Sequence, residues 1–307
     1  MDEIGKSSVF ARTDISPALE LGAYEWLWLH RADSYAGIAG LFRQAAGSLP
    51  SELASEDGAR AIAQQAIAQL ARAGVTTFGV RVQGSGDYPE RLLDAEDPVP
   101  VLYYQGWWDL IDAPRRVAVV GSREVSDKGI RRTKKLVKML VEHRCAIISG
   151  LARGVDTVAH ETAIEAGGAT IGVAGTPLSD CDEKSDARLQ RQIAAEFLLL
   201  SPVPVLAWQE QEAQRPRVFY PERARTMAAL ADATIIVEAG QVSVTLIQAQ
   251  AALKLGRNLF ILNGCFDQPN VTWPAKLEAR GAIRVTEFEQ ILATLRKREA
   301  HAPAAHR

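Results

Sequence analysis

The sequence predicts an α/β protein in which a small N-terminal helical module precedes a doubly wound, mostly parallel sheet. Two observations predict the sheet. From Arg116 onward, short apolar runs rich in β-branched residues alternate with helical segments of about 10 to 15 residues. These runs show no polar alternation, which is typical of strands that helices cover on both faces. The chain has 307 residues, a length that corresponds to roughly two domains and leaves room for the module.

The helical module is predicted from apolar spacing in the first quarter of the chain. Ile62, Ala66 and Leu70 recur at helical spacing, and Gly74 supplies a stop signal. Two strand-like segments follow, separated by a connector rich in turn residues. We therefore expect helices at 19–29, 36–46 and 58–73, and strands at 75–82 and 98–104.

The rest of the chain supplies the predicted sheet. We expect strands at 117–120, 146–148, 170–173, 234–237 and 259–262, with an edge strand at 282–285. We expect helices at about 128–143, 156–166, 186–196, 222–231, 244–255 and 286–297. The predicted division is a leader (1–17), a helical module (18–82), a linker (83–114), the α/β domain (115–297) and a disordered tail (298–307). Ligands of doubly wound sheets bind beyond the carboxyl ends of the strands, so we expect the site in those loops.

Composition excludes several classes of protein. Hydrophobic residues make up 47% and charged residues 23% of the chain, a balance typical of a globular protein and not of a disordered one. Cys145, Cys181 and Cys265 are far apart and form no CxxC pair, which argues against a disulfide scaffold or a zinc site. No apolar run approaches the ~20 residues of a membrane span, and the N-terminus lacks the core of a signal peptide. We expect a cytoplasmic protein.

The charge is unevenly distributed along the chain. The net charge is -2, but residues 1–114 hold 8 basic and 16 acidic side chains, whereas residues 115–296 hold 24 and 20. Such asymmetry fits a polyanion-binding domain attached to an acidic module. It also fits uneven surface charge with no partner, and the count alone does not decide between them.

The loop after the strand at 117–120 has the chemistry of a phosphate site. Its Gly121 lets the backbone turn, Ser122 offers a hydroxyl beside backbone amides, and Arg123 offers a bidentate fork. The next helix carries six further cations, which are either phosphate ligands or the solvated face of an amphipathic helix. These six are Lys128, Arg131, Arg132, Lys134, Lys135 and Lys138.

Two further strands end in similar loops. The strand at 146–148 leads into a glycine loop at 149–154, whose amides can point at phosphate oxygens. Asp156 is predicted to cap the next helix, and His160, one turn later, to be a packed helix residue rather than a catalytic one. The strand at 170–173 leads into a turn at Gly175 and Thr176.

Several catalytic signatures are absent from the sequence. It contains no GxxxxGK[ST] loop, no GxGxxG after a strand, no GxSxG elbow and no HExxH pair. An ordinary NTPase, dehydrogenase or hydrolase is therefore disfavoured.

Five segments, in this order and spacing, resemble the DprA/Smf family of DNA-processing proteins. They are VAVVGSR (Val117–Arg123), SGLARGVDTVAH (Ser149–His160), GGATIGVAGTPL (Gly167–Leu178), YPERARTMAALADATIIVEA (Tyr220–Ala239) and SVTLIQAQAALKLGR (Ser243–Arg257). The resemblance covers about 115–285. GDYPERLL (Gly86–Leu93) and the N-terminal helices are similar to the family's linker and its small module of SAM or helix-hairpin type.

The resemblance implies a Rossmann-like domain that binds and protects single-stranded DNA and aids loading of a RecA-type recombinase in natural transformation (competence) and recombination. It implies a binding protein and not an enzyme, without metal or cofactor, that forms a homodimer through the α/β domain. Bases are expected to stack on Phe219 or Tyr220. The expected DNA- or phosphate-binding residues are Gly121, Ser122, Arg123, Ser149, Gly150, Leu151, Arg153, Gly154, Gly175, Thr176, Lys184, Arg223, Arg225, Ser243 and Thr245.

Departures from the family pattern leave two alternatives open. Asp182-Glu183 places acid beside Lys184, Glu222 and Ala224 replace an arginine and an asparagine, and we expect no C-terminal winged helix. One alternative is a sensor of nucleotides or small ligands that keeps the glycine pocket without binding DNA. The other is a nucleotide-cleaving enzyme with Glu238 as its only candidate.

Overall fold

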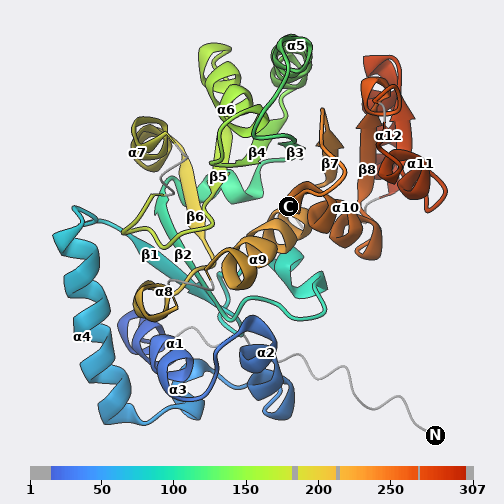
Figure 1. Ribbon diagram of the computed structural model, residues 1–307. Helices are drawn as coiled ribbons and strands as arrows, with labels where there is room; N and C mark the ends of the chain where they lie inside the picture. The colour runs from blue at the N-terminus through green and yellow to red at the C-terminus, as the bar shows by residue number, and fades with distance from the viewer. Residues whose placement is uncertain (1–14, 182–185, 212–214, 269, 302–307) are drawn as a thin grey trace, which may run out of the picture.

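The computed structural model describes residues 15–181, 186–211, 215–268 and 270–301. Within them, helices and strands alternate as the sequence predicts (Figure 1). The N-terminal part contains α1 (Pro17–His30), α2 (Tyr35–Gln44), α3 (Pro50–Leu53), α4 (Glu56–Arg72), β1 (Gly79–Val82), η1 (Glu90–Asp94), β2 (Val101–Gly106) and η2 (Trp108–Asp112). The rest contains β3 (Arg116–Val120), α5 (Asp127–Glu142), β4 (Ala146–Gly150), α6 (Val155–Glu165), β5 (Thr170–Val173), α7 (Ala187–Glu196), β6 (Leu198–Ser201), α8 (Val205–Glu210), α9 (Arg215–Leu230), β7 (Ala233–Ile236), α10 (Val244–Lys254), β8 (Asn258–Leu262), η4 (Asn263–Cys265), α11 (Trp273–Glu278), β9 (Ile283–Val285) and α12 (Phe288–His301).

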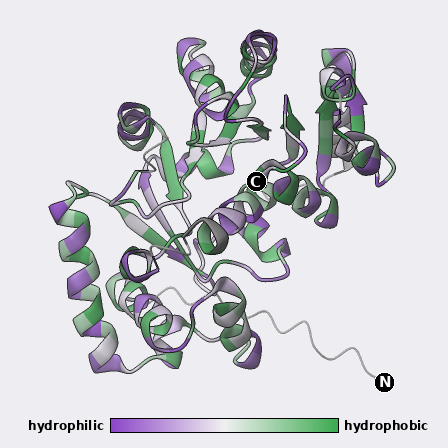
Figure 2. Ribbon diagram, in the orientation of Figure 1, coloured by the Kyte–Doolittle hydropathy of each residue, from purple (hydrophilic) through white to green (hydrophobic). Residues whose placement is uncertain are grey.

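All strands of the described residues form one nine-stranded sheet, in the order β1-β2-β6-β5-β4-β3-β7-β8-β9. From β6 to β9 every neighbouring pair is parallel, while β2 pairs antiparallel with β6 and β1 antiparallel with β2. The central strands are hydrophobic in Figure 2, as expected where helices cover both faces. The predicted doubly wound, mostly parallel sheet is confirmed.

Strand β6 is the main element that the sequence reading missed. It consists of only four residues, three of them leucine, which lie between α7 and the proline-rich start of α8. Leucine has no strong preference for strands, and so short an apolar run does not distinguish a strand from a buried helix. Helices α8 and α11 were also missed. Helix α9 begins seven residues before its expected start at 222 and contains Pro221 within it.

The chain reverses its winding direction beside β3. Strands β4, β5 and β6 extend the sheet to one side of β3, and β7 then returns to its other side. Ala118 of β3 is opposite Ile148 of β4 and also opposite Thr234 of β7. The loops after β3 and β7 therefore diverge and leave a crevice between them, which is where sheets of this type hold ligands.

The N-terminal helices pack directly on the sheet layer. Trp28 of α1 lies 5.7 Å from Phe219 of α9, ring centre to ring centre, within one buried cluster that also includes Tyr103 of β2. Glu25 of α1 is fully buried and accepts hydrogen bonds from the backbone N–H of Val205 (2.6 Å) and the hydroxyl of Tyr103 (2.7 Å). Burial raises the pKa of this carboxyl, while these donors oppose the rise.

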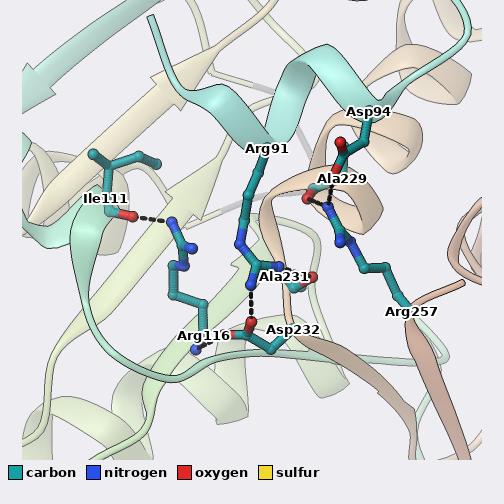
Figure 3. A network of polar contacts seen from close by, with 8 residues as sticks. All are labelled: Arg91, Asp94, Ile111, Arg116, Ala229, Ala231, Asp232 and Arg257. Carbon is teal, nitrogen blue, oxygen red and sulfur yellow. Dashed lines mark hydrogen bonds and ion pairs between the residues drawn. The ribbon is translucent and has the colours of Figure 1, made fainter. Parts of the chain in front are cut away.

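A polar network joins the segment before β3 to the amino ends of the central strands (Figure 3). Arg91 of η1 pairs with Asp232, which also accepts a 2.7 Å hydrogen bond from the backbone N–H of Arg116. Arg257, the residue before β8, pairs with Asp94. The segment expected to be a linker therefore contributes β2 and this network, and the boundaries of the domains stay a prediction.

None of the helices in the described residues is long and apolar enough to cross a membrane.

Candidate nucleic-acid interface

A cleft of about 400 Å³ opens at the carboxyl ends of β3, β4 and β7. Loops that are far apart in the sequence lie side by side around it, because these three strands are neighbours in the sheet. Of the residues predicted to bind phosphate, the cleft is lined by Gly121, Ser122, Arg123, Arg153, Arg223, Ser243 and Thr245. Three further polar residues line the cleft that were not predicted as site residues, namely Glu124, Asp156 and Gln248. All three follow the carboxyl end of a strand, which is where the site was expected.

The loops after β3 and β4 interlock through Gly154. This residue has a φ of +86°, which strongly favours glycine, and a β-carbon there would collide with the carbonyl oxygen of Ser122. The same Ser122 carbonyl accepts a 3.1 Å hydrogen bond from the N–H of Val155. The N–H of Ser122 donates to the backbone carbonyl of Glu238 (2.6 Å), and its hydroxyl forms hydrogen bonds with Glu124 in the same loop. Ser122 therefore shapes the cleft more than it offers donors to a ligand.

Asp156 does not cap its helix, and that expectation is wrong. Gly154 is the N-cap of α6, and Asp156 is the second helical residue, with 6% of its surface exposed. A β-carbon at Gly150 would be 2.6 Å from Oδ2 of Asp156 and 2.7 Å from Nη1 of Arg223, so carboxylate and guanidinium meet over that glycine. Burial raises the pKa of Asp156 to about 6, against the opposing effect of Arg223.

Two arginines of the cleft share one aromatic ring. The guanidinium carbons of Arg123 and Arg223 lie 5.6 Å and 5.9 Å from the ring centre of Tyr220. Tyr220 is half-buried, whereas Phe219 is fully buried, so Phe219 cannot serve as a stacking surface for bases. Of the two predicted platforms, only Tyr220 is accessible.

Helix α10 presents its amino end to the cleft. The hydroxyl of Ser243 accepts a 3.1 Å hydrogen bond from the N–H of Thr245, which caps the helix. The Thr245 hydroxyl donates to the carbonyl of Gly121 at 3.4 Å. The partial positive charge of a helix amino end adds to the field of the arginines.

Other predicted residues lie beside or beneath the cleft. Leu151, Gly175 and Thr176 line a small neighbouring hollow that Arg223 and Tyr220 also border. Ser149 is buried and donates to the carbonyl of Val119 at 2.6 Å, which is a structural role. Lys184 lies outside the described residues.

The structure does not bring Arg225 to the cleft. Its Nη1 is 3.1 Å from Oε2 of Glu222, and both residues line a separate cavity of about 640 Å³ between α2, α9 and α10. Lys254 and Glu96, which also line this cavity, pair with each other. In the larger cavity, therefore, carboxylates neutralise more of the positive charge, and an anionic ligand is attracted less strongly than in the cleft.

Two residues considered as catalytic groups are held in structural roles. His160 is buried, with Nε2 2.9 Å from the Gly150 carbonyl and Nδ1 2.7 Å from the Thr170 hydroxyl, which confirms the prediction of a packed histidine. Burial lowers its pKa to about 4, so it is neutral at physiological pH. Glu238 accepts hydrogen bonds from the N–H (3.0 Å) and hydroxyl (2.6 Å) of Ser126, before α5. No cluster of metal ligands occurs among the residues that the structure describes.

Fold and cleft together define a class: a doubly wound α/β protein with an arginine-lined crevice at the switch point of its sheet. Residues 79–296 match the family model described as DNA recombination-mediator protein A. The chain therefore belongs to this family, the DprA/Smf proteins, as the sequence motifs predicted.

Curated relatives support the same assignment. The DNA processing protein DprA of Streptococcus pneumoniae is 37% identical over 210 residues, which cover 66% of this chain and 71% of that protein. Protein Smf of Synechocystis is 36% identical over 212 residues, which cover 68% of this chain and 52% of that protein. The match thus spans only about half the length of the Synechocystis relative.

Solved structures agree with the fold. The X-ray structure of DprA from Streptococcus pneumoniae superposes with a TM-score of 0.70 at 27% identity, covering 92% of this chain and 98% of that one. A Helicobacter pylori DprA structure, described for its single-stranded DNA binding mode, gives a TM-score of 0.60 at 25% identity, with 72% and 97% covered.

Proposed function

We propose that this protein binds single-stranded DNA in the cleft at the ends of β3, β4 and β7 and acts in DNA uptake by natural transformation and in recombination. The observation that carries the proposal is the convergence of Arg123, Arg153 and Arg223, from three separate segments, on one crevice. Three guanidinium groups around a helix amino end suit a phosphodiester backbone. The family and the described binding mode of the Helicobacter pylori relative support the choice of DNA.

Each group in the cleft has a distinct role in this proposal. Arg123 and Arg223 bind phosphates while the Tyr220 ring positions both guanidinium groups and offers its exposed part to a base. Asp156, buried beneath Arg223, fixes the position of that guanidinium. Arg153 is exposed at the rim, where it meets the strand as it enters or leaves.

Partners beyond DNA are proposed from family membership alone. We infer that the protein protects single strands and aids loading of a RecA-type recombinase, that it forms a homodimer, that it is cytoplasmic, and that it binds DNA without catalysing a reaction. A nucleotide sensor is not favoured, because the relatives from Streptococcus pneumoniae and Bacillus subtilis are named as DNA processing proteins. A nucleotide-cleaving enzyme is disfavoured because both carboxylate oxygens of Glu238, its only candidate catalytic group, already accept hydrogen bonds from Ser126.

The test is a fluorescence anisotropy titration of a labelled oligothymidylate with the parent protein and with Arg123→Ala. We expect the parent's log K to fall against log salt with a slope of about -2, for three phosphates at about -0.7 each, and the variant to bind about tenfold more weakly. The matched control is Arg72→Ala, an exposed arginine on α4, which is expected to bind as the parent does. Equal binding by parent and Arg123→Ala, or binding that ignores salt, would contradict the proposal.

A further inference from the structure

Helix α5 has an exposed cationic face that the cleft does not use. Its other side is buried against the sheet through Gly129, Thr133, Leu136, Val137 and Leu140. The solvent side carries the six basic residues whose role the sequence left open, and all six are exposed: Lys128, Arg131, Arg132, Lys134, Lys135 and Lys138.

The charge on this face is not balanced by neighbouring carboxylates. Within α5 the acidic residues are Asp127 and Glu142, one at each end. Across the described part of the chain, none of the six cations forms an ion pair, whereas Arg60 of α4 pairs with Glu56 at 2.7 Å. Arg131 and Lys135 are one turn apart, and like charges at that spacing repel and destabilise a helix. Such a face is more stable when a polyanion lies along it.

The position of α5 makes it an extension of the cleft. The helix begins four residues after Arg123, and Ser126 at its N-cap is held by Glu238, which follows β7. Arg132 lies over Gly264 in the turn after β8, where a β-carbon would collide with its guanidinium. A helix of 16 residues runs for about 24 Å, so the face leads from the ends of the strands along the side of the molecule.

We propose that the exposed face of α5 binds the phosphodiester backbone of single-stranded DNA where the strand continues beyond the cleft. This inference rests on the proposed function and adds a second, sequence-independent contact to it. The chemistry of the face favours a nucleic acid over a lipid surface. Its exposed side chains are all charged, and the apolar residues Ile130, Met139 and Val141 are half-buried, so no apolar side chain is available to enter a bilayer.

The experiment compares two lengths of oligothymidylate, one of about 6 nucleotides that fills the cleft alone and one of about 30 that reaches beyond it. The variant is Arg131→Ala/Lys135→Ala, and the matched control is Arg60→Ala/Arg72→Ala on α4, which loses the same charge at the opposite end of the molecule (Figure 1). For the long strand we expect the α5 variant to bind about tenfold more weakly at low salt, with a salt slope shallower by about 1.4. For the short strand it is expected to match the parent, and the control to match the parent with both strands.

The outcomes separate the two proposals. If the short strand binds and depends on Arg123, but the α5 variant equals the parent on the long strand, the proposed role of α5 is wrong and the cleft stands. If the α5 variant loses binding to phosphatidylserine vesicles and not to the long strand, the face belongs to a lipid surface and the inference is overturned. If the parent binds neither strand, the function of the cleft itself is refuted. Circular dichroism and a thermal melt of each variant check that a loss of binding does not come from unfolding.

Discussion

At the scale of single residues, helix α9 separates two arginines that the family motif places together. Arg223 lines the cleft with Asp156, whereas Arg225 pairs with Glu222 and lines the larger cavity. Residues two apart on a helix point in nearly opposite directions, so the two side chains cannot share one ligand. The motif alone therefore predicts two arginines of α9 in the site, whereas the structure places only Arg223 there.

This geometry predicts different effects from equal substitutions. Arg223→Ala removes a phosphate ligand, and we expect single-stranded DNA binding to weaken about tenfold with a salt slope shallower by about 0.7. Arg225→Ala is expected to bind within about twofold of the parent, because its guanidinium is not in the cleft. Anisotropy titrations at three salt concentrations measure both effects, with thermal unfolding as the check on folding. A loss with Arg225→Ala as large as with Arg223→Ala would refute the assignment.

At the scale of an element, helix α6 buries two titratable groups with opposite effects on stability. The pKa of Asp156 rises from 3.8 to about 6, so its contribution is present below pH 3.8 and lost as the pH rises through 6. The pKa of His160 falls from 6.5 to about 4, so its contribution is present above pH 6.5 and lost as the pH falls through 4. Between pH 4 and 6.5 the two dependences nearly cancel.

Removing one of the two groups should expose the pH dependence of stability that comes from the other. In Asp156→Asn, acidification from pH 6.5 to 4 should lower the free energy of unfolding relative to the parent by about 3 kcal/mol, at 1.36 kcal/mol per pKa unit. In His160→Gln the same acidification should raise it, relative to the parent, by a similar amount. Urea denaturation at four pH values gives the differences. Parallel pH profiles for the parent and both variants would mean that neither group is buried as described.

The elements show what could be predicted from sequence. Strands β3, β4, β5, β7 and β8 were placed to within two residues at each end, because each is a buried apolar run followed by a turn. The cleft was predicted for the same reason, since carboxyl ends of neighbouring strands meet at one edge. The placement of Asp156 beside Arg223 and the burial of Phe219 could not be predicted, because both depend on how α6 and α9 pack against the sheet.

At the scale of the whole molecule, the network in Figure 3 attaches the N-terminal part to the amino ends of the central strands. Asp232 has 8% of its surface exposed, and removing its partly buried partner with Arg91→Ala should lower the free energy of unfolding by about 2 kcal/mol, as for hydrogen bonds to charged groups. Arg43→Ala breaks the exposed pair with Asp97 and should cost under about 1 kcal/mol. Urea denaturation distinguishes the two, and equal losses would show that the network does not hold the parts together.

The antiparallel strands β1 and β2 close the flank of the sheet next to β6. A shortened fragment starting at residue 115 would lack both strands and leave the backbone amides and carbonyls of β6 open to water. Because that strand is rich in leucine and carries no charged side chain to keep other strands away, it would become a template on which further molecules add. Fragments made for solution work should therefore begin before Gly79 if they are to remain monodisperse.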